Sequence, residues 1–590
     1  MALINMSCTD YLSLPVEADK NTEDIFGDYY NFQGFVDQLY TYVDDPIVGQ
    51  LTMDYCYGGE TIGTTSWSTG YNSVRGLYSQ YLTRGYLSTQ DDYGVGVWNG
   101  WKAIRVANIG LDNLSMMSGT VEEKNKIKGQ LLFMRAFFHH ELLTVWGSIP
   151  FIDQVLTDEF NLPRFGEYQA LDGNTYQGYQ ACAVKIAEDM QQASELLPIA
   201  WDNDVANRGR CTALAALAYK ARALVYAASP LMSQYSGSSI NDLKSATVNK
   251  SLMKQAAEAA SSAIKMAEDN YIAYGLLDWE HYTDMFYTVD GITMPWSKET
   301  LWGRYNTVKG STLIANTIGR IHLPDNSVFG GNAVNCTPTQ NYVDMFEMSD
   351  GSLYKVDYDG VVYMDGGVQK CKMWDDRDPR FRRAIYVDRD NPGDTKKTIL
   401  ELYNGGKTRN ANNCQTPYYI HKFWPWNCNK TDNGTEYNNM RIMVPLMRLA
   451  EVYLLYAEAV YQSEGDANKT AGNCGYTALQ AVNKIRERAK HVPTTATGGA
   501  HGDFIKMILN ERAVEFCFEG HFWYDIRRYK LGESMSKEAI LTLDFTKEWT
   551  NFSRRTLLNR TFDSPKHYWV PFPTNLNKMY PEFPQNTGWE

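Results

Sequence analysis

Three segments near the C-terminus decide the fold: RLAEVYLLYAEAV (448–460), ALQAVNKIRERA (478–489) and FIKMILNERAVEFCFEGHFWYDIRRYK (504–530). In the first segment, apolar residues recur at offsets of three, four and seven, so they share one helical stripe, while Glu451 and Glu458 fall outside it. The third segment follows Asp503, a good helix N-cap, and Gly520 is suited to end it. All three segments are therefore predicted to be helices.

Helical patterns also occur in pairs earlier in the chain. Thr120 and Glu123 have the spacing of a capping box, and Gly147 suits the end of the helix that they begin. The predicted helices cover about 98–117, 120–145, 176–197 and 211–228, a third pair begins near 251, and a fourth contains the segments at 448 and 478. We therefore predict a mostly α fold, a superhelix of about four helix pairs similar to tetratricopeptide units.

Residues 279–440 differ in composition from the helical segments, since they are rich in Gly, Asn, Asp, Pro and aromatic residues. The Asp-Gly dipeptides at 350–351, 359–360 and 365–366 are typical of hairpin turns. We predict a loop-rich region with minor β structure packed on the helices, where recognition usually resides.

Composition excludes several classes of protein. The chain has 590 residues and a net charge of -13, without a dense basic run, so nucleic acid is not an expected partner. No stretch approaches the roughly 18 continuous apolar residues that a membrane-spanning helix needs. The 40 Tyr, 23 Phe and 15 Trp provide flat apolar faces with polar edges, which suit recognition as well as core packing.

Catalytic and metal-binding motifs are missing from the sequence. His140-Glu141 lacks the second histidine of a zinc protease, and Glu401 stands where the P-loop ending at 405–408 requires its first glycine. The cysteines show no zinc-like spacing. We expect no enzyme activity, metal or cofactor, although a carboxylate pair for glycoside hydrolysis is defined only by its separation in space.

Several motifs resemble those of the RagB/SusD family of outer-membrane nutrient-binding lipoproteins. The third segment matches the family pattern at Asn510, Glu511, Arg512, Glu515, Phe516, Glu519, Gly520, Asp525 and Arg528. Further matches are 338–346 with 350–351, the Arg-Asp-Pro-Arg-Phe element at 377–381, and the tail at 570–573 and 585–589. The chain departs from the family at His521 and Trp523, where an arginine is usual, and at Thr587, where a proline is usual.

The resemblance implies a division of the chain and a location. The expected parts are a signal remnant with its lipidation cysteine (1–8), a helical region with three pairs (9–278), a loop-rich ligand-binding region (279–440) and a C-terminal region with the fourth pair (441–590). Family members carry lipid on a cysteine at the start of the mature chain, so Cys8 is expected to anchor the protein to the outer membrane, facing the exterior.

The resemblance also implies a function. It predicts a glycan-binding lipoprotein that captures oligosaccharides and delivers them to a SusC-like TonB-dependent transporter. Family members bind sugars with aromatic residues from an early loop and from loops after the third helix pair. The residues that correspond by location are Tyr57, Trp67, Tyr71, Asn72 and Arg75 in the early loop, and Trp279, Tyr282, Trp296 and Phe329 in the later loops.

Two alternatives remain open from the sequence. The RagB branch of the family takes up peptides, and a peptide pocket would use backbone hydrogen bonds and charged anchors in place of stacked rings. A glycoside hydrolase is the least favoured alternative, and formation of product from glycans would distinguish it.

Trp67 lies in a polar loop with little local core to join, so its indole is expected to bind a sugar ring. We predict that Trp67→Ala weakens retention of the protein on an immobilised polysaccharide. Retention that is unchanged across a panel of polysaccharides would instead favour the peptide-binding alternative.

Overall fold

The computed structural model describes most of the helical scaffold and part of the loops. The residues that it describes are 21–43, 57–63, 69–78, 99–156, 163–164, 166–202, 204–233, 235–236, 239–240, 247–305, 336–355, 357–392, 399–410, 414–426, 428, 434–572 and 584–590. Cys8, Trp67 and Phe329 lie outside these ranges.

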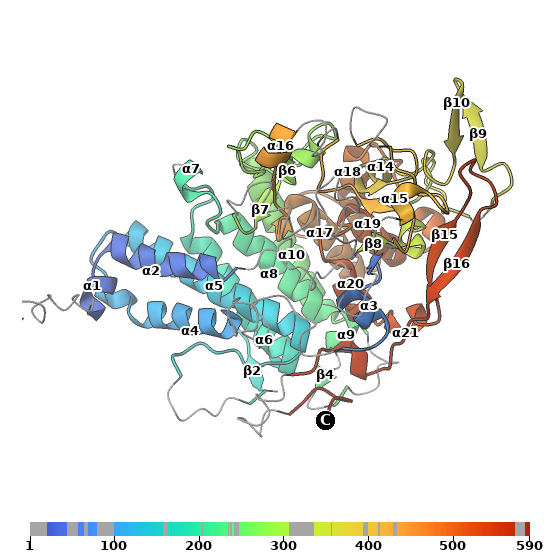
Figure 1. Cartoon of the computed structure of the whole chain (residues 1–590). Helices are drawn as coiled ribbons and strands as arrows, with labels where there is room; N and C mark the ends of the chain where they lie inside the picture. Colours follow the sequence, from blue (N-terminus) through green and yellow to red (C-terminus); the bar gives the residue numbers. More distant parts are fainter. Residues whose placement is uncertain are drawn as a thin grey trace, which may run out of the picture.

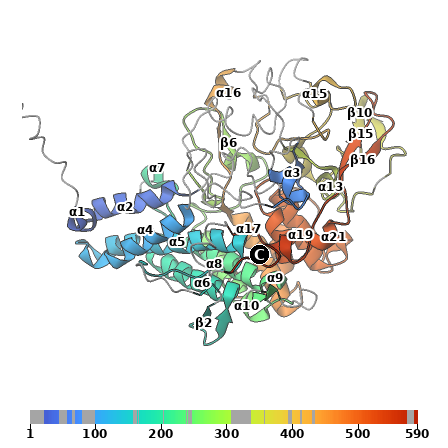
Figure 2. The ribbon, with the colours of Figure 1, turned by 60° about the horizontal axis from the view of Figure 1, so that its bottom comes forward.

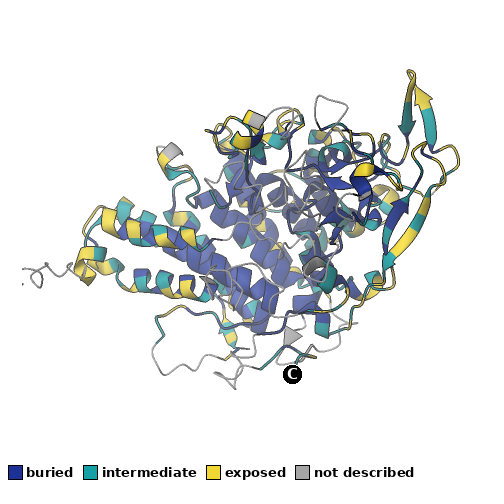
Figure 3. Cartoon of the chain, viewed as in Figure 1, coloured by how far each residue is buried: buried dark blue, intermediate teal, exposed yellow. Residues whose placement is uncertain are grey.

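A layer of consecutive, mutually packed helices forms the scaffold (Figure 1). Its helices are α2 (Tyr29–Thr41), α4 (Asn99–Asp112), α5 (Val121–Trp146), α6 (Gly178–Leu196), α8 (Ala213–Ala228), α10 (Lys250–Asp269), α17 (Leu449–Glu464), α18 (Ala478–Arg488) and α19 (Phe504–Glu515). Figure 3 shows that buried residues concentrate along α5, α6, α8, α10 and α17. The predicted mostly α fold is confirmed.

Shorter elements complete the described chain. The short helices are α1 (Thr22–Phe26), α3 (Thr69–Val74), α7 (Asp204–Asn207), α9 (Pro230–Ser233), α13 (Gln340–Val343), α14 (Pro379–Ala384), α15 (Lys407–Asn410), α16 (Gly434–Asn439), α20 (Phe522–Arg528) and α21 (Gly532–Met535), with the 3₁₀ turns η3 (Leu114–Met116), η4 (Tyr282–Met285), η6 (Gly499–His501) and η7 (Lys566–Tyr568).

All described strands form two-stranded antiparallel ribbons. The pairs are β1 (Thr61–Ile62) with β8 (Thr337–Pro338), β2 (Glu167–Gln169) with β3 (Thr175–Gln177), β4 (Tyr235–Ser236) with β5 (Ser239–Ile240), β6 (Tyr287–Thr288) with β13 (Arg441–Ile442), β7 (Thr300–Trp302) with β14 (Met447–Arg448), β9 (Val362–Asp365) with β10 (Val368–Cys371), β11 (Ile385–Tyr386) with β12 (Tyr419–Ile420), and β15 (Ile540–Asp544) with β16 (Ser553–Leu558). The β9–β10 hairpin, predicted from its Asp-Gly turn, projects from the upper right of Figure 1.

The helix ends follow from specific caps. The Thr120 hydroxyl accepts a hydrogen bond from the Glu123 backbone N–H at 3.2 Å, and the Glu123 carboxylate accepts one from the Thr120 N–H at 2.8 Å, so the predicted capping box is confirmed. Asp503 caps α19 as predicted. However, α19 ends at Glu515 and not near Gly520, because the chain already turns at Phe518, which has a φ of 62°.

One neighbour of α10, the helix that begins the predicted third pair, comes from a distant part of the chain and belongs to the predicted fourth pair. Helix α10 packs between α8 and α17, and the loop-rich region separates α10 from α17 in the sequence. Alanines fill the buried side of α10, at 256, 257, 259, 260, 263 and 267, so its axis can approach its neighbours closely. Figures 1 and 2 show the loop-rich region, with α15 and α16, on one side of this layer.

A buried ion network joins the loop-rich region to the helices. Arg448, at the start of α17, contacts the carboxylates of Glu299 at 3.0 Å, Glu515 at 2.7 Å and Glu519 at 2.9 Å. Lys422 contacts Glu519 at 2.6 Å. The same network includes Arg380, which contacts Glu515 at 3.1 Å, and Arg488, which contacts Glu299 at 2.9 Å. Glu515, Glu519 and Arg380, which are among the residues that carried the family resemblance, therefore have a structural role.

Two carboxylates of the network, those of Glu515 and Glu519, are held in the ionised form. Burial by itself would raise the pKa of Glu515, but Arg488, Arg448 and Arg380 outweigh burial and hold its pKa far below the usual range. Burial also opposes ionisation of Glu519, whose pKa Arg448 and Lys422 lower. Removal of one partner would leave buried charges without compensation.

We predict that Arg448→Ala destabilises the protein by about 3–5 kcal/mol, because Glu299, Glu515 and Glu519 would lose a shared counter-ion in the interior. The measurement is the midpoint of chemical unfolding. Lys265→Ala, which removes the solvent-exposed pair with Asp269 on α10, is the control and should leave the midpoint nearly unchanged. Equal midpoints for the two variants would contradict the role of the network.

Candidate functional site

The predicted early-loop residues that the structure describes lie on α3 or beside α20. Tyr57 is buried, and its ring meets that of Trp523 edge-on with centroids 5.1 Å apart. Tyr71 and Asn72 lie on α3, where the half-buried Tyr71 ring packs on Ile62, Val74 and Ile540. The exposed Arg75 guanidinium lies 5.2 Å from the centroid of the Tyr71 ring.

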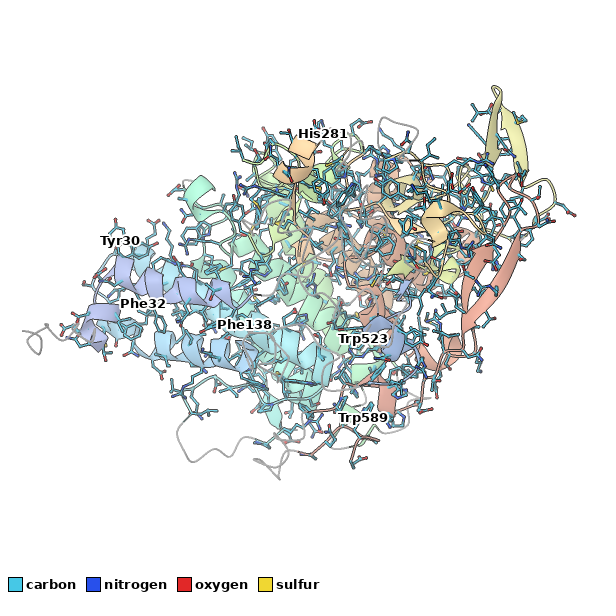
Figure 4. All side chains as sticks on the ribbon, in the orientation of Figure 1. Tyr30, Phe32, Phe138, His281, Trp523 and Trp589 are labelled. Carbon is cyan, nitrogen blue, oxygen red and sulfur yellow. The ribbon has the colours of Figure 1, made fainter. Side chains whose placement is uncertain are left out.

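Trp279 and Tyr282 lie elsewhere, in the loop-rich region. Their rings contact each other with centroids 5.3 Å apart, and the guanidinium of Arg383 lies 3.9 Å from the centroid of the half-buried Trp279 ring. Tyr282 is buried, and burial raises its pKa well above the usual range. Figure 4 shows His281, next to Tyr282, at the upper edge and Trp523 far below it, so the early-loop and η4 residues do not form one site.

Trp296 lies at a third place, a concave region of the surface. Two adjoining cavities, of about 350 and 310 Å³, share Arg208, Gly209 and Arg210 as lining residues, and we call them together the twin cavity. The larger one is lined by residues that include Trp201, Tyr274, Trp296 and Lys298. The smaller one is lined by residues that include Asp37, Tyr40, Trp302, Arg304 and Tyr305.

The rings of the twin cavity are fixed by their surroundings. The half-buried indole of Trp201 donates a hydrogen bond from Nε1 to the carbonyl oxygen of Cys211 at 2.9 Å. Trp296 and Tyr305, both half-buried, meet edge-to-face with centroids 6.2 Å apart. Tyr274 donates from its hydroxyl to the carbonyl oxygen of Ile199 at 2.6 Å. Rings held in this way lose little freedom when a ligand binds.

Arg210 connects the two cavities to the helices. Its guanidinium contacts both carboxylate oxygens of Asp37 on α2, and it also donates to Gln130 on α5 at 3.2 Å. Burial alone would lower the pKa of Arg210, but the contact with Asp37 outweighs burial and raises it. The charge of Arg210 is therefore matched by Asp37, which is the single carboxylate among the described lining residues.

This arrangement suits a molecule with flat apolar faces and a polar rim. Trp201, Trp296 and Tyr305 can cover apolar faces, while arginine and lysine side chains can bond to rim oxygens. Within the described ranges, no group of three His, Cys, Asp or Glu side chains could hold a metal ion, and no helix is long and apolar enough to span a membrane.

Of the sequence-predicted residues that the structure describes, Trp296 alone lines the twin cavity. Trp201, Tyr305 and the run Arg208-Gly209-Arg210 were not predicted. The sequence offered one signal for these residues. A Trp and two Arg lie between the predicted helices 176–197 and 211–228, and connecting segments often carry binding residues.

Comparison with known proteins gives a consistent picture. Residues 298–589 match the model of the SusD family, and residues 10–226 match a model described as starch-binding associating with outer membrane. SusD-like protein P2 from Formosa agariphila is 24% identical over 455 residues, which cover 75% of this chain and 74% of the relative.

Solved structures share the fold. A SusD-like carbohydrate binding protein from Bacteroides fragilis superposes with a TM-score of 0.65 at 17% identity, covering 95% of this chain and 100% of that one. A laminarin binding SusD-like protein gives a TM-score of 0.57 at 16% identity, with coverage of 94% and 98%. The helical scaffold is therefore common to proteins whose sequences differ widely.

Gly209 shapes the wall between the two cavities. It has a φ of 90°, and an added Cβ would lie 2.9 Å from the Cβ of Tyr305. We predict that Gly209→Ala displaces Tyr305 and destabilises the protein by more than the about 1–2 kcal/mol of backbone strain alone.

Gly173→Ala is the matched control, because Gly173 has a φ of 83° with nothing within 4 Å of the added Cβ. Unfolding measurements compare the two variants, and a crystal structure of Gly209→Ala locates Tyr305. An equal loss of stability in both variants, with Tyr305 in place, would contradict the prediction.

Proposed function

Because the chain belongs to the SusD/RagB family, we propose that it captures oligosaccharides at the cell surface and delivers them to a SusC-like TonB-dependent transporter in the outer membrane. The observation that carries the ligand class is the twin cavity, in which the partly exposed rings of Trp201, Trp296 and Tyr305 stand beside cationic side chains. Two proteins that share the fold, one carbohydrate binding and one laminarin binding, support the same class of ligand.

The physical basis of binding is stacking combined with hydrogen bonding at the rim. A pyranose ring presents C–H groups on one face, which an indole such as that of Trp296 or Trp201 can cover. Burial contributes about 25 cal/mol per Å² of apolar surface, and desolvation of hydroxyl groups offsets part of it. Moderate affinity follows, and it suits a protein that must release its cargo.

The proposed anchor and partner rest on family membership. Lipid on Cys8 would hold the protein at the outer membrane, and several acyl chains together give durable attachment, since each buried methylene contributes about 0.8 kcal/mol. The transporter would supply the energy for uptake, so the protein itself needs only to bind and release.

We further propose that binding occurs without hydrolysis. A glycosidase of the usual kind needs two carboxyl groups across the scissile bond. The described lining of the twin cavity offers one carboxylate, that of Asp37, which accepts hydrogen bonds from both terminal nitrogens of the Arg210 guanidinium. Incubation with glycans should therefore release no shorter products.

Trp296→Ala and Trp201→Ala are each predicted to weaken oligosaccharide binding about tenfold, equivalent to ~1.4 kcal/mol, because each removes a ring from the twin cavity. Isothermal titration calorimetry measures the affinity. Trp426→Ala is the control, because Trp426 is 42% exposed but lies against Tyr386 and His421, away from the lining residues. Binding of peptides in place of oligosaccharides would overturn the ligand class.

A further inference from the structure

We infer that the twin cavity selects anionic oligosaccharides, which carry carboxylate or sulfate groups, over neutral ones. This inference rests on the proposed function and names the ligand class of the same site. It begins from a local reversal of charge, because the chain as a whole has a net charge of -13 whereas the twin cavity is basic.

The described lining contains four cationic side chains and one carboxylate. Arg208, Arg210, Lys298 and Arg304 are the cations, and Asp37 is the carboxylate. Asp37 is matched by Arg210, through contacts from both terminal nitrogens of the guanidinium. The excess charge therefore includes Lys298 in the larger cavity and Arg304 in the smaller one.

Neither Lys298 nor Arg304 forms an ion pair with a carboxylate of the described residues. Arg304 donates a hydrogen bond from Nη1 to the backbone carbonyl oxygen of Val43 at 2.9 Å, which orients the guanidinium without neutralising it. Glu299, the residue after Lys298, is buried and directed into the ion network, where it lies 3.0 Å from Arg448 and 2.9 Å from Arg488. Lys298 itself is exposed to solvent.

Each cavity combines a partly exposed ring with one of these cations. Trp296 and Lys298 line the larger cavity, whereas Tyr305 and Arg304 line the smaller one. An acidic pyranose offers the matching pair of features, an apolar ring face and an anionic group at the rim. A guanidinium can bind such a group through two parallel hydrogen bonds, and a partly buried site weakens the screening by salt. The two adjoining cavities would accept neighbouring sugar units of one oligosaccharide.

The experiment compares matched probes by isothermal titration calorimetry at low and high NaCl. The first pair is the galacturonic acid hexamer and its carboxyl-reduced galactose counterpart, and the second is a sulfated galactan oligosaccharide and its desulfated form. We expect one anionic probe to bind at least tenfold more tightly than its neutral partner, with the preference reduced at high salt. The pair that shows the preference identifies the carboxylate or the sulfate.

Arg304→Gln and Lys298→Gln should each lower the affinity for the anionic probe much more than the affinity for its neutral partner, and so reduce that preference. Lys265→Gln, which alters a cation on α10 outside the twin cavity, should have no effect. Equal binding of charged and neutral probes, or a preference that survives both substitutions, would overturn the inference. If the inference fails in this way but the oligosaccharide probes bind Trp296→Ala more weakly than the unsubstituted protein, the proposed function stands. If no oligosaccharide binds but peptides do, the proposed function fails as well.

Discussion

The ionic contacts around Arg448 and Glu515 are the constraint on which the remaining structure depends. Glu515 lies at the end of α19, and it receives Arg448 from α17, Arg488 from α18 and Arg380 from the loop-rich region. The side chains of all four residues are almost completely shielded from solvent, so each charge is tolerated only while its partners stay in place. The network therefore fixes one arrangement of the loop-rich region on the helices.

A buried network of this kind is a poor source of net stability, because desolvation of the charges offsets much of their attraction. Its contribution is better understood as specificity. Glu299 shows the connection to the binding site, since it is followed by β7, which leads to Arg304 and Tyr305 at the smaller cavity. The position of the cavity walls therefore depends on the buried charges of the ion network, which do not line the twin cavity themselves.

The sequence predicted the helices better than the contacts between them. The capping box at Thr120 and the N-cap at Asp503 depend on neighbouring residues, so local spacing was sufficient. Glu451 and Glu458 were placed off the apolar stripe, yet both are fully buried, because Arg222 and Arg528 reach them from other helices. Periodicity cannot reveal a charge that is matched by a residue far away in the sequence.

The binding site was predicted less completely for the same reason. Trp296 was identified, but the twin cavity joins the end of α2, the connection between α6 and α8, and the segment around β7. Only the folded chain brings these segments together. The roles predicted for Tyr57, Tyr71, Asn72, Arg75, Trp279 and Tyr282 stay predictions, and Trp67 and Phe329 fall outside the described residues.

The separation of α10 from α17 in the sequence has a consequence for biogenesis. The apolar side of α10 that meets α17 has no native cover until residues 449–464 have been made. At about 5–20 residues per second, translation of the roughly 180 intervening residues takes on the order of 10–40 s. A newly made chain therefore has an incomplete helical scaffold during that interval. The uncovered side of α10 is then the surface that chaperones of nascent proteins would shield.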